Sequence, residues 1–337
     1  MWGWWLQNQM RKFLLGKGVD NLTRNKGIGI RGINIVYLLT ALLLISLGAA
    51  YQEKDVLKGL LFTEYVLVLL PPLIYIKLKG DSFKRVLRLN ALRLKHAVMV
   101  IFITILSYPV ALFFNLVGMT LLSTFGEIIQ PPIPTAENFR EYFILMLVIS
   151  VSAGICEEVY FRGLILRGYE GLGIANAIVI SSVLFGVFHF NLQNLLGPIV
   201  LGLIFGYLVY RTDSIFAGIL GHITNNGVAV TLGYIANVAN ERLMDQPVDP
   251  IQEALPGTLQ LIGATFLVGV WATVSGLLAY LLLRVIIRET EGRTQGHVEE
   301  PVSKSKVSFF AFIPVILTLL LFAYIGYLQI LQMGMVK

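Results

Sequence analysis

Residues 143–162 read FILMLVISVSAGICEEVYFR, and this stretch decides the fold. From Phe143 to Cys156 the residues are apolar or small, Glu157 and Glu158 follow, and Arg162 comes one helical turn later. Burying a carboxylate in a membrane is costly, so acidic residues in such a run mark a pathway or a reaction site. We therefore expect the functional site of the protein to lie here.

The composition indicates a polytopic helical membrane protein. Of the 337 residues, 56% are hydrophobic and 14% charged, and the mean hydropathy is +0.75, whereas a soluble domain is about one-quarter charged. The apolar runs are long and continuous, unlike the alternating segments of about ten residues in a β-barrel. Nine runs are long enough, or nearly so, to span a bilayer, with 196–211 short enough to be a partial span: 33–51, 57–77, 97–122, 142–165, 173–191, 196–211, 214–238, 258–287 and 307–333.

The basic residues predict the orientation. The net charge is +6, but Lys and Arg cluster at the ends of the apolar runs, which favours a lipid partner over a nucleic acid. With the N-terminus in the cytoplasm, the internal segments hold 21 of the 26 Lys and Arg residues. This bias predicts a cytoplasmic N-terminus. The compact chain suggests a multi-pass protein of a prokaryotic plasma membrane.

The chain divides into one membrane domain with flanking segments. We expect residues 1–32 to form a basic interfacial segment, 33–287 the transmembrane domain, 288–306 a cytoplasmic linker, and 307–337 a C-terminal transmembrane helix. Residues 81–96 carry basic and apolar side chains that indicate an amphipathic helix on the inner membrane surface, with a loop that only sets the topology as an equal alternative.

Two further polar clusters follow the glutamates, one ending at His189 and one running from His222 to Asn226. If the runs containing Glu157 and His189 form a hairpin at Gly168–Gly173, both residues lie sixteen positions from Gly173, or about 24 Å from the turn. Asn226 lies four residues after His222, on the same helix face. The sequence thus predicts that these four side chains share one layer of the bundle, with Glu157 beside His189.

The neighbouring glutamates should have different roles. Glu158 and Arg162 are four residues apart with the acid first, the favourable order for a helical ion pair. Glu157 points about 100° away and can face another helix. A carboxylate with an imidazole can deprotonate water, and a second imidazole with a carboxamide can stabilise an oxyanion. The set therefore predicts a hydrolase attacking an amide.

The order and spacing of these motifs resemble the CPBP family, which contains type II CAAX prenyl endopeptidases and bacterial bacteriocin-processing or immunity proteins. Glu157 to Arg162 fits EExxxR, Phe185 to His189 fits FxxxH, and His222 to Asn226 fits HxxxN; the resemblance covers about 142–230. It implies a glutamate-type intramembrane protease acting on a membrane-associated peptide or protein near the cytoplasmic face. Glu157 and His189 would activate water, His222 and Asn226 would form the oxyanion hole, and Glu158 and Arg162 would support the site.

Other interpretations remain open at this point. Two histidines and a glutamate can bind zinc, but HExxH is absent, so we expect neither a metal nor another cofactor. The runner-up is a non-catalytic membrane protein that binds a peptide in the same pocket, as in immunity or signalling; a proton-relaying transporter comes third. Asn225 competes with Asn226, Cys156 is expected to be a packing residue, and Glu64 to pair with an unidentified basic group. Altogether we predict an all-α membrane protein of about eight to nine transmembrane helices with a four-helix catalytic core.

Overall fold

The computed structural model describes residues 28–129, 134–243, 257–292 and 308–335, and the ordered elements within these ranges are all helices. Most of the predicted interfacial segment 1–32 and of the predicted linker 288–306 therefore lies outside the described residues. The helices are α3 (Ile30–Leu43), α4 (Ala49–Lys54), α5 (Val56–Phe62), α6 (Leu70–Leu78), α7 (Phe83–Val86), α8 (Leu94–Leu122), α9 (Phe139–Leu145), α10 (Ala153–Glu158), α11 (Leu166–Tyr169), α12 (Ile174–Phe188), α13 (Leu196–Thr212), α14 (Ile215–Leu243), α15 (Thr258–Glu289) and α16 (Ile313–Met335).

Seven helical segments among the described residues are long and apolar enough to cross a membrane, which confirms a polytopic helical membrane protein. The segments are 30–54, 56–78, 94–122, 139–172, 215–240, 258–289 and 313–335. The two remaining predicted spans, α12 and α13, are shorter, with 15 and 17 residues. Fifteen residues rise about 22 Å, less than the hydrocarbon thickness of about 30 Å. These two helices pack against each other as a hairpin.

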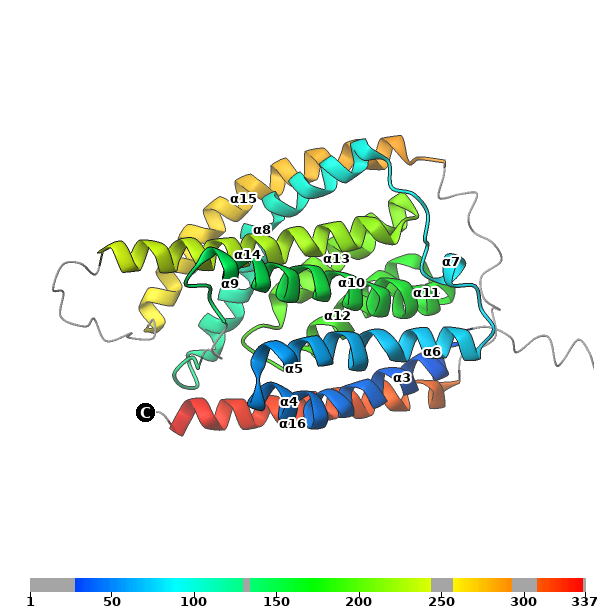
Figure 1. The fold of residues 1–337 in the computed structure, drawn as a ribbon, viewed down its shortest axis with the longest axis horizontal. Helices are drawn as coiled ribbons and strands as arrows, with labels where there is room; N and C mark the ends of the chain where they lie inside the picture. The colour runs from blue at the N-terminus through cyan, green and yellow to red at the C-terminus, as the bar shows by residue number, and fades with distance from the viewer. Residues whose placement is uncertain (1–27, 130–133, 244–256, 293–307, 336–337) are drawn as a thin grey trace, which may run out of the picture.

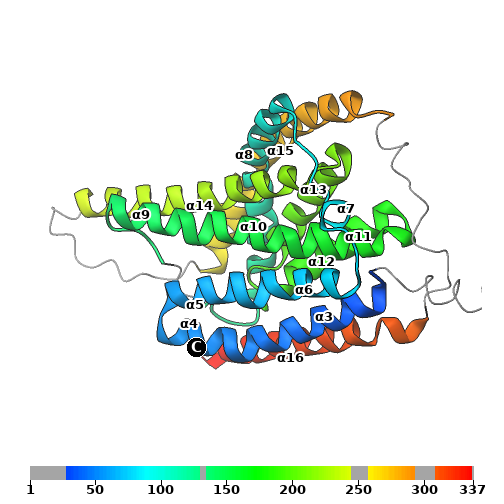
Figure 2. The same cartoon turned by 45° about the vertical axis from the view of Figure 1, so that its right-hand side comes forward.

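The segment 139–172 occupies the middle of the bundle (Figures 1 and 2). Half of its most apolar window is buried, against 17% for α15 at the periphery. On one side lie α5 and α6 and then the pair α3 and α16; on the other lie α14, α13 and the crossed pair α8 and α15. The main hydrophobic core forms where Tyr160 and Phe161 meet Tyr37, Phe185 and Phe188.

Two π-helical turns interrupt this central segment, Met146–Ser152 and Val159–Ile165, and the α-helical turns that carry the glutamates lie between them. A π-turn inserts an extra residue per turn and is frequent at functional sites. Side chains that follow such a turn therefore point in other directions than they would in a regular α-helix.

The predicted amphipathic helix at 81–96 is wrong. Only Phe83–Val86 is helical; residues 89–93 are extended or irregular, and α8 begins at Leu94. Arg88 has a positive φ of 49° and its side chain is buried instead of lying on the membrane surface. The side chain folds inward because two carboxylates inside the bundle bind its guanidinium.

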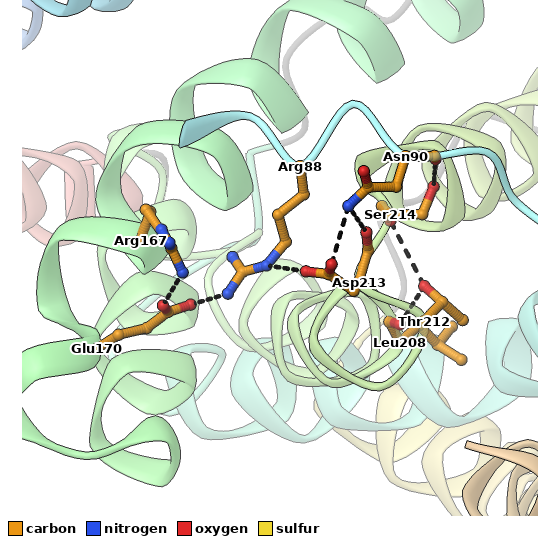
Figure 3. Close-up of polar contacts among 8 residues, drawn as sticks. All are labelled: Arg88, Asn90, Arg167, Glu170, Leu208, Thr212, Asp213 and Ser214. Carbon is orange, nitrogen blue, oxygen red and sulfur yellow. Dashed lines mark hydrogen bonds and ion pairs between the residues drawn. The ribbon is translucent and has the colours of Figure 1, made fainter. Parts of the chain in front are cut away.

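Arg88 is the centre of an ionic cluster that joins three turns (Figure 3). Its guanidinium forms ion pairs with Glu170, beyond α11, and with Asp213, between α13 and α14, where Nε lies 3.0 Å from Oδ1. Arg167 also binds Glu170, at 2.7 Å, and Asn90 donates to Asp213. All three turns belong to the segments with a predicted cytoplasmic location, so the structure brings them to one end of the bundle, as that prediction requires.

Candidate active site

A buried ion pair lies at the base of the candidate site. The Arg162 Nη1 atom donates to Glu158 Oε1 at 2.6 Å, and both side chains are almost completely inaccessible. This is the predicted pair within one helix. The same oxygen also accepts a hydrogen bond from His222 Nδ1 at 3.0 Å, so Glu158 links the central segment to α14.

Aromatic rings and a glycine enclose this pair. The guanidinium of Arg162 lies over the rings of Phe185 and Phe205, 4.6 and 5.7 Å from their centroids. Such a cation–π arrangement stabilises a desolvated cation. On α14, Gly218 presents no side chain toward Glu158, and a Cβ there would collide with the carboxylate. The glycine at position 218 thus permits the close approach of α14 to the Glu158 carboxylate.

Glu157 faces a different environment. Its Oε2 atom lies 3.8 Å from His222 Nε2, its side chain is 13% exposed, and this oxygen is buried without a hydrogen-bond partner among the described residues. As predicted, Glu157 is the glutamate without a cationic partner in its own helix. The imidazole at this distance belongs to His222; the pairing of Glu157 with His189 stays a prediction.

His189 lies at the C-terminal end of α12 and is exposed. Its Nδ1 atom lies 2.9 Å from the Phe185 carbonyl oxygen, which can only accept, so Nδ1 carries the proton. The ring of Phe185 contacts both imidazoles, with centroids 5.1 Å from His189 and 5.7 Å from His222. The depth prediction assumed a regular rise to Gly173, whereas the π-turn at 159–165 lies between Glu157 and the turn.

Asn226 lies one turn from His222 on α14, as predicted. Its Nδ2 atom donates to the Ile149 carbonyl at 3.0 Å, and its Oδ1 accepts from Asn225 at 3.1 Å. The amide plane is therefore fixed, and one Nδ2 hydrogen is not used by these two bonds. Asn225 acts in the structure as a donor that orients Asn226.

Sequence reasoning missed one residue at the site, the buried Glu64 in the π-helical turn Thr63–Leu69. The expected basic partner is absent from the described residues, and its Oε2 atom has no hydrogen bond there. The turn that carries Glu64 packs against α10, which carries Glu157. The only sequence signal was an acid inside an apolar run, which gave no indication of which helix it would face.

Metal-ligand geometry is not preformed in the described part of the chain, where no group of three His, Cys, Asp or Glu side chains is arranged to hold a metal ion. Cys156 is completely buried, in keeping with its predicted packing role.

The site thus offers a carboxylate with an unused oxygen, two imidazoles with Nδ1 hydrogen-bonded, and a fixed amide. These are the groups that water activation and oxyanion stabilisation require.

Comparison with known proteins gives one family model that covers the candidate site and one similar protein. Residues 139–228 match the family model described as type II CAAX prenyl endopeptidase Rce1-like. A protein of Bacillus subtilis (strain 168) with the name "Putative membrane peptidase YdiL" is 34% identical over 90 residues, which are 26% of this chain and 37% of that protein. The match thus covers little more than a third of the relative. No solved structure matches the chain.

Proposed function

From the match of residues 139–228 to the Rce1-like family, which supports membrane protease activity, we propose that this protein is an intramembrane endopeptidase of the glutamic type. The observation that carries the proposal is the position of Glu157. This carboxylate has a buried oxygen without a hydrogen-bond partner, 3.8 Å from an imidazole. Such a carboxylate can bind a water molecule and remove its proton.

In the proposed reaction Glu157 takes a proton from water, and the resulting hydroxide attacks the carbonyl carbon of the scissile peptide bond. His189, whose Nδ1 is hydrogen-bonded to Phe185, presents Nε2 to hold the water from the other side. The C–N bond then breaks as Glu157 returns the proton to the leaving nitrogen, giving a carboxylic acid and an amine. A positioned base contributes about 10²- to 10⁴-fold to such a rate.

His222 and Asn226 are the proposed oxyanion donors. The hydrogen bond between His222 Nδ1 and Glu158 turns Nε2 toward Glu157, where the attacked carbonyl would lie. When Nε2 also carries a proton, the group of Glu157, Glu158, Arg162 and His222 has no net charge. This neutrality limits the cost of keeping four ionised groups inside the bundle.

The proposed substrate is a membrane-associated peptide or protein cleaved near the cytoplasmic face. His222 lies eight residues from Ser214, which is about 12 Å along α14 from the turn at the Arg88 cluster. The proposed orientation, with a cytoplasmic N-terminus in a prokaryotic plasma membrane, puts that end of the bundle inside the cell.

The proposal is tested by comparing membrane peptides from cells that produce the intact protein, Glu157→Ala or Glu157→Gln at equal levels. We expect a set of cleaved peptides that only the intact protein generates. Identical peptide profiles and full biological activity in all three would reject proteolysis and favour the peptide-binding alternative. A chelator that abolishes cleavage, with recovery on adding zinc, would instead favour the metal-dependent mechanism.

A further inference from the structure

The loop that follows His189 connects α12 to α13. The first of these helices, α12, is only about 22 Å long, which is less than the thickness of the hydrocarbon layer, so we expect the loop to lie within the depth of the membrane. Backbone N–H and C=O groups at that depth cannot bind water freely, so non-helical chain is tolerated only where protein groups satisfy it. Phe190 has a positive φ of 47°, which costs energy in a bulky residue. Contacts from outside the hairpin must therefore hold this loop.

Gln329 of α16 provides two of these contacts. Its Oε1 atom accepts from the Leu192 N–H at 3.0 Å, and its Nε2 atom donates to the Phe190 carbonyl at 2.7 Å. One side chain thus satisfies an acceptor and a donor two residues apart. The acceptor, the Phe190 carbonyl, belongs to the residue directly after His189.

The same face of α16 packs against the loop. Phe322, Gly326 and Gln329 are spaced by four and three residues, so they lie on one side of the helix. The ring of Phe322 contacts that of Phe190, with centroids 6.3 Å apart. A Cβ at Gly326 would come within 2.8 Å of the Leu192 side chain. The contact between helix and loop is therefore continuous over two helical turns.

We infer that Gln329 is a positioning residue for His189: it holds the Phe190–Leu192 backbone, and thereby orients the imidazole toward the proposed water site. This inference rests on the proposed function. It makes α16, which lies outside the matched residues 139–228, a part of the catalytic arrangement. A displacement of about 1 Å in a catalytic group can cost about 10²-fold in rate.

The test uses the full chain with Gln329→Ala, Gln329→Met and Gln332→Ala. Methionine keeps the side-chain length but not the two hydrogen bonds, and Gln332 is an exposed residue on the same helix. We expect both Gln329 variants to generate the cleaved peptides on the order of 10- to 100-fold more slowly per folded protein. Gln332→Ala should behave as the intact protein.

A second readout needs no substrate. The chain has four histidines, so the ¹⁵N signals of His189 can be assigned in nanodiscs with the help of a His189→Gln sample. We expect Gln329→Ala and Gln329→Met to shift or broaden the His189 signals while those of His222 stay in place. Unchanged His189 signals would overturn the inference, as would intact-protein rates in Gln329→Met.

The two readouts separate the inference from the proposed function. If Glu157→Gln leaves the peptide profile unchanged, the proposed function fails, and with it any catalytic meaning of the contact. If Glu157→Gln abolishes cleavage while Gln329→Ala retains it fully, only the role of Gln329 is rejected.

Discussion

Glu157 and Glu158 are adjacent in sequence and both lie near His222, yet only Glu158 is held by hydrogen bonds. Glu158 binds Arg162 at 2.6 Å and His222 at 3.0 Å, whereas the Oε2 atom of Glu157 has no hydrogen bond among the described residues. A buried charge that compensates another is structural, because its removal leaves its partner unpaired. Oε2 of Glu158 is likewise without a hydrogen bond among the described residues, but its Oε1 is held by Arg162 and His222. Glu157 accepts no hydrogen bond from either residue, so its carboxylate is the one available for chemistry.

This difference predicts opposite effects for two matched substitutions. Glu158→Gln should destabilise the protein by about 3 kcal/mol, because Arg162 then remains buried without its counter-charge. Glu157→Gln should leave the unfolding temperature unchanged or raise it, because it removes a charge that no hydrogen bond compensates. Thermal unfolding in detergent measures both. Equal destabilisation by the two variants would contradict the assigned roles.

Gly218 gives a second residue-scale prediction. Gly218→Ala introduces a Cβ that collides with Glu158 and lies 2.9 Å from Val209, so we expect a loss of about 1–3 kcal/mol together with reduced cleavage. The control is Gly263→Ala, on α15, where a Cβ meets no atom within 4 Å. That substitution should be neutral or stabilise by up to about 1 kcal/mol. If the Gly218→Ala and Gly263→Ala proteins unfold at the same temperature, the close approach at Gly218 does not contribute to stability.

Local spacing predicted some contacts at this scale and missed others. The pairing of Glu158 with Arg162 follows from one helical turn, so the sequence was sufficient to predict it. The imidazole next to Glu157 depends on the packing of three helices and on a π-turn, which the assumed regular rise left out. Glu64 and Gln329 act on the site from other helices, and no motif includes them.

At the scale of elements, the turn at Arg88 shows why an amphipathic pattern was misleading. The basic residues at 84–95 are typical of a surface helix, but Arg88 has two carboxylates to bind inside the bundle, on turns far away in sequence. The nine apolar runs were correctly located as helices. The helix α12 ends at Phe188, and the loop after His189 is held by Gln329 of α16, a contact that no local pattern predicts.

We expect Arg88→Ala to destabilise the protein by about 2 kcal/mol, because Glu170 and Asp213 lose a shared cationic partner while keeping some contact with water. The exposed Lys84→Ala in α7 is the control and should have no effect. Thermal unfolding at low ionic strength measures the difference. An Arg88→Ala protein as stable as the control would show that the cluster does not hold the three turns together.

At the scale of the whole molecule, the orientation of the protein in the membrane can be tested by cysteine labelling, because the chain has a single natural cysteine. Cys156 is completely buried, so a membrane-impermeant maleimide should not label the natural protein. We expect Glu137→Cys to be labelled in right-side-out vesicles and Lys84→Cys only in inverted ones, because the proposed orientation puts the basic loops in the cytoplasm. Labelling of Lys84→Cys in right-side-out vesicles would reverse the proposed orientation.

The arrangement of the bundle explains why so short a matched segment depends on the rest of the chain. Residues 139–228 contain every proposed catalytic side chain, but Arg88 and Gln329 contact the supporting turns from outside this range, and the turn that carries Glu64 packs against α10. The peripheral helices therefore do more than shield the core from lipid. They complete the environment of Glu157 and the loop after His189.

The central claim is that Glu157 activates the water that attacks the peptide bond. Its most direct test is the cleavage rate of Glu157→Gln relative to the intact protein, measured in proteoliposomes on a peptide identified by the membrane comparison and normalised to folded protein. We expect Glu157→Gln to cleave the peptide about 10²- to 10⁴-fold more slowly than the intact protein. A rate within a factor of two of the intact protein would contradict it.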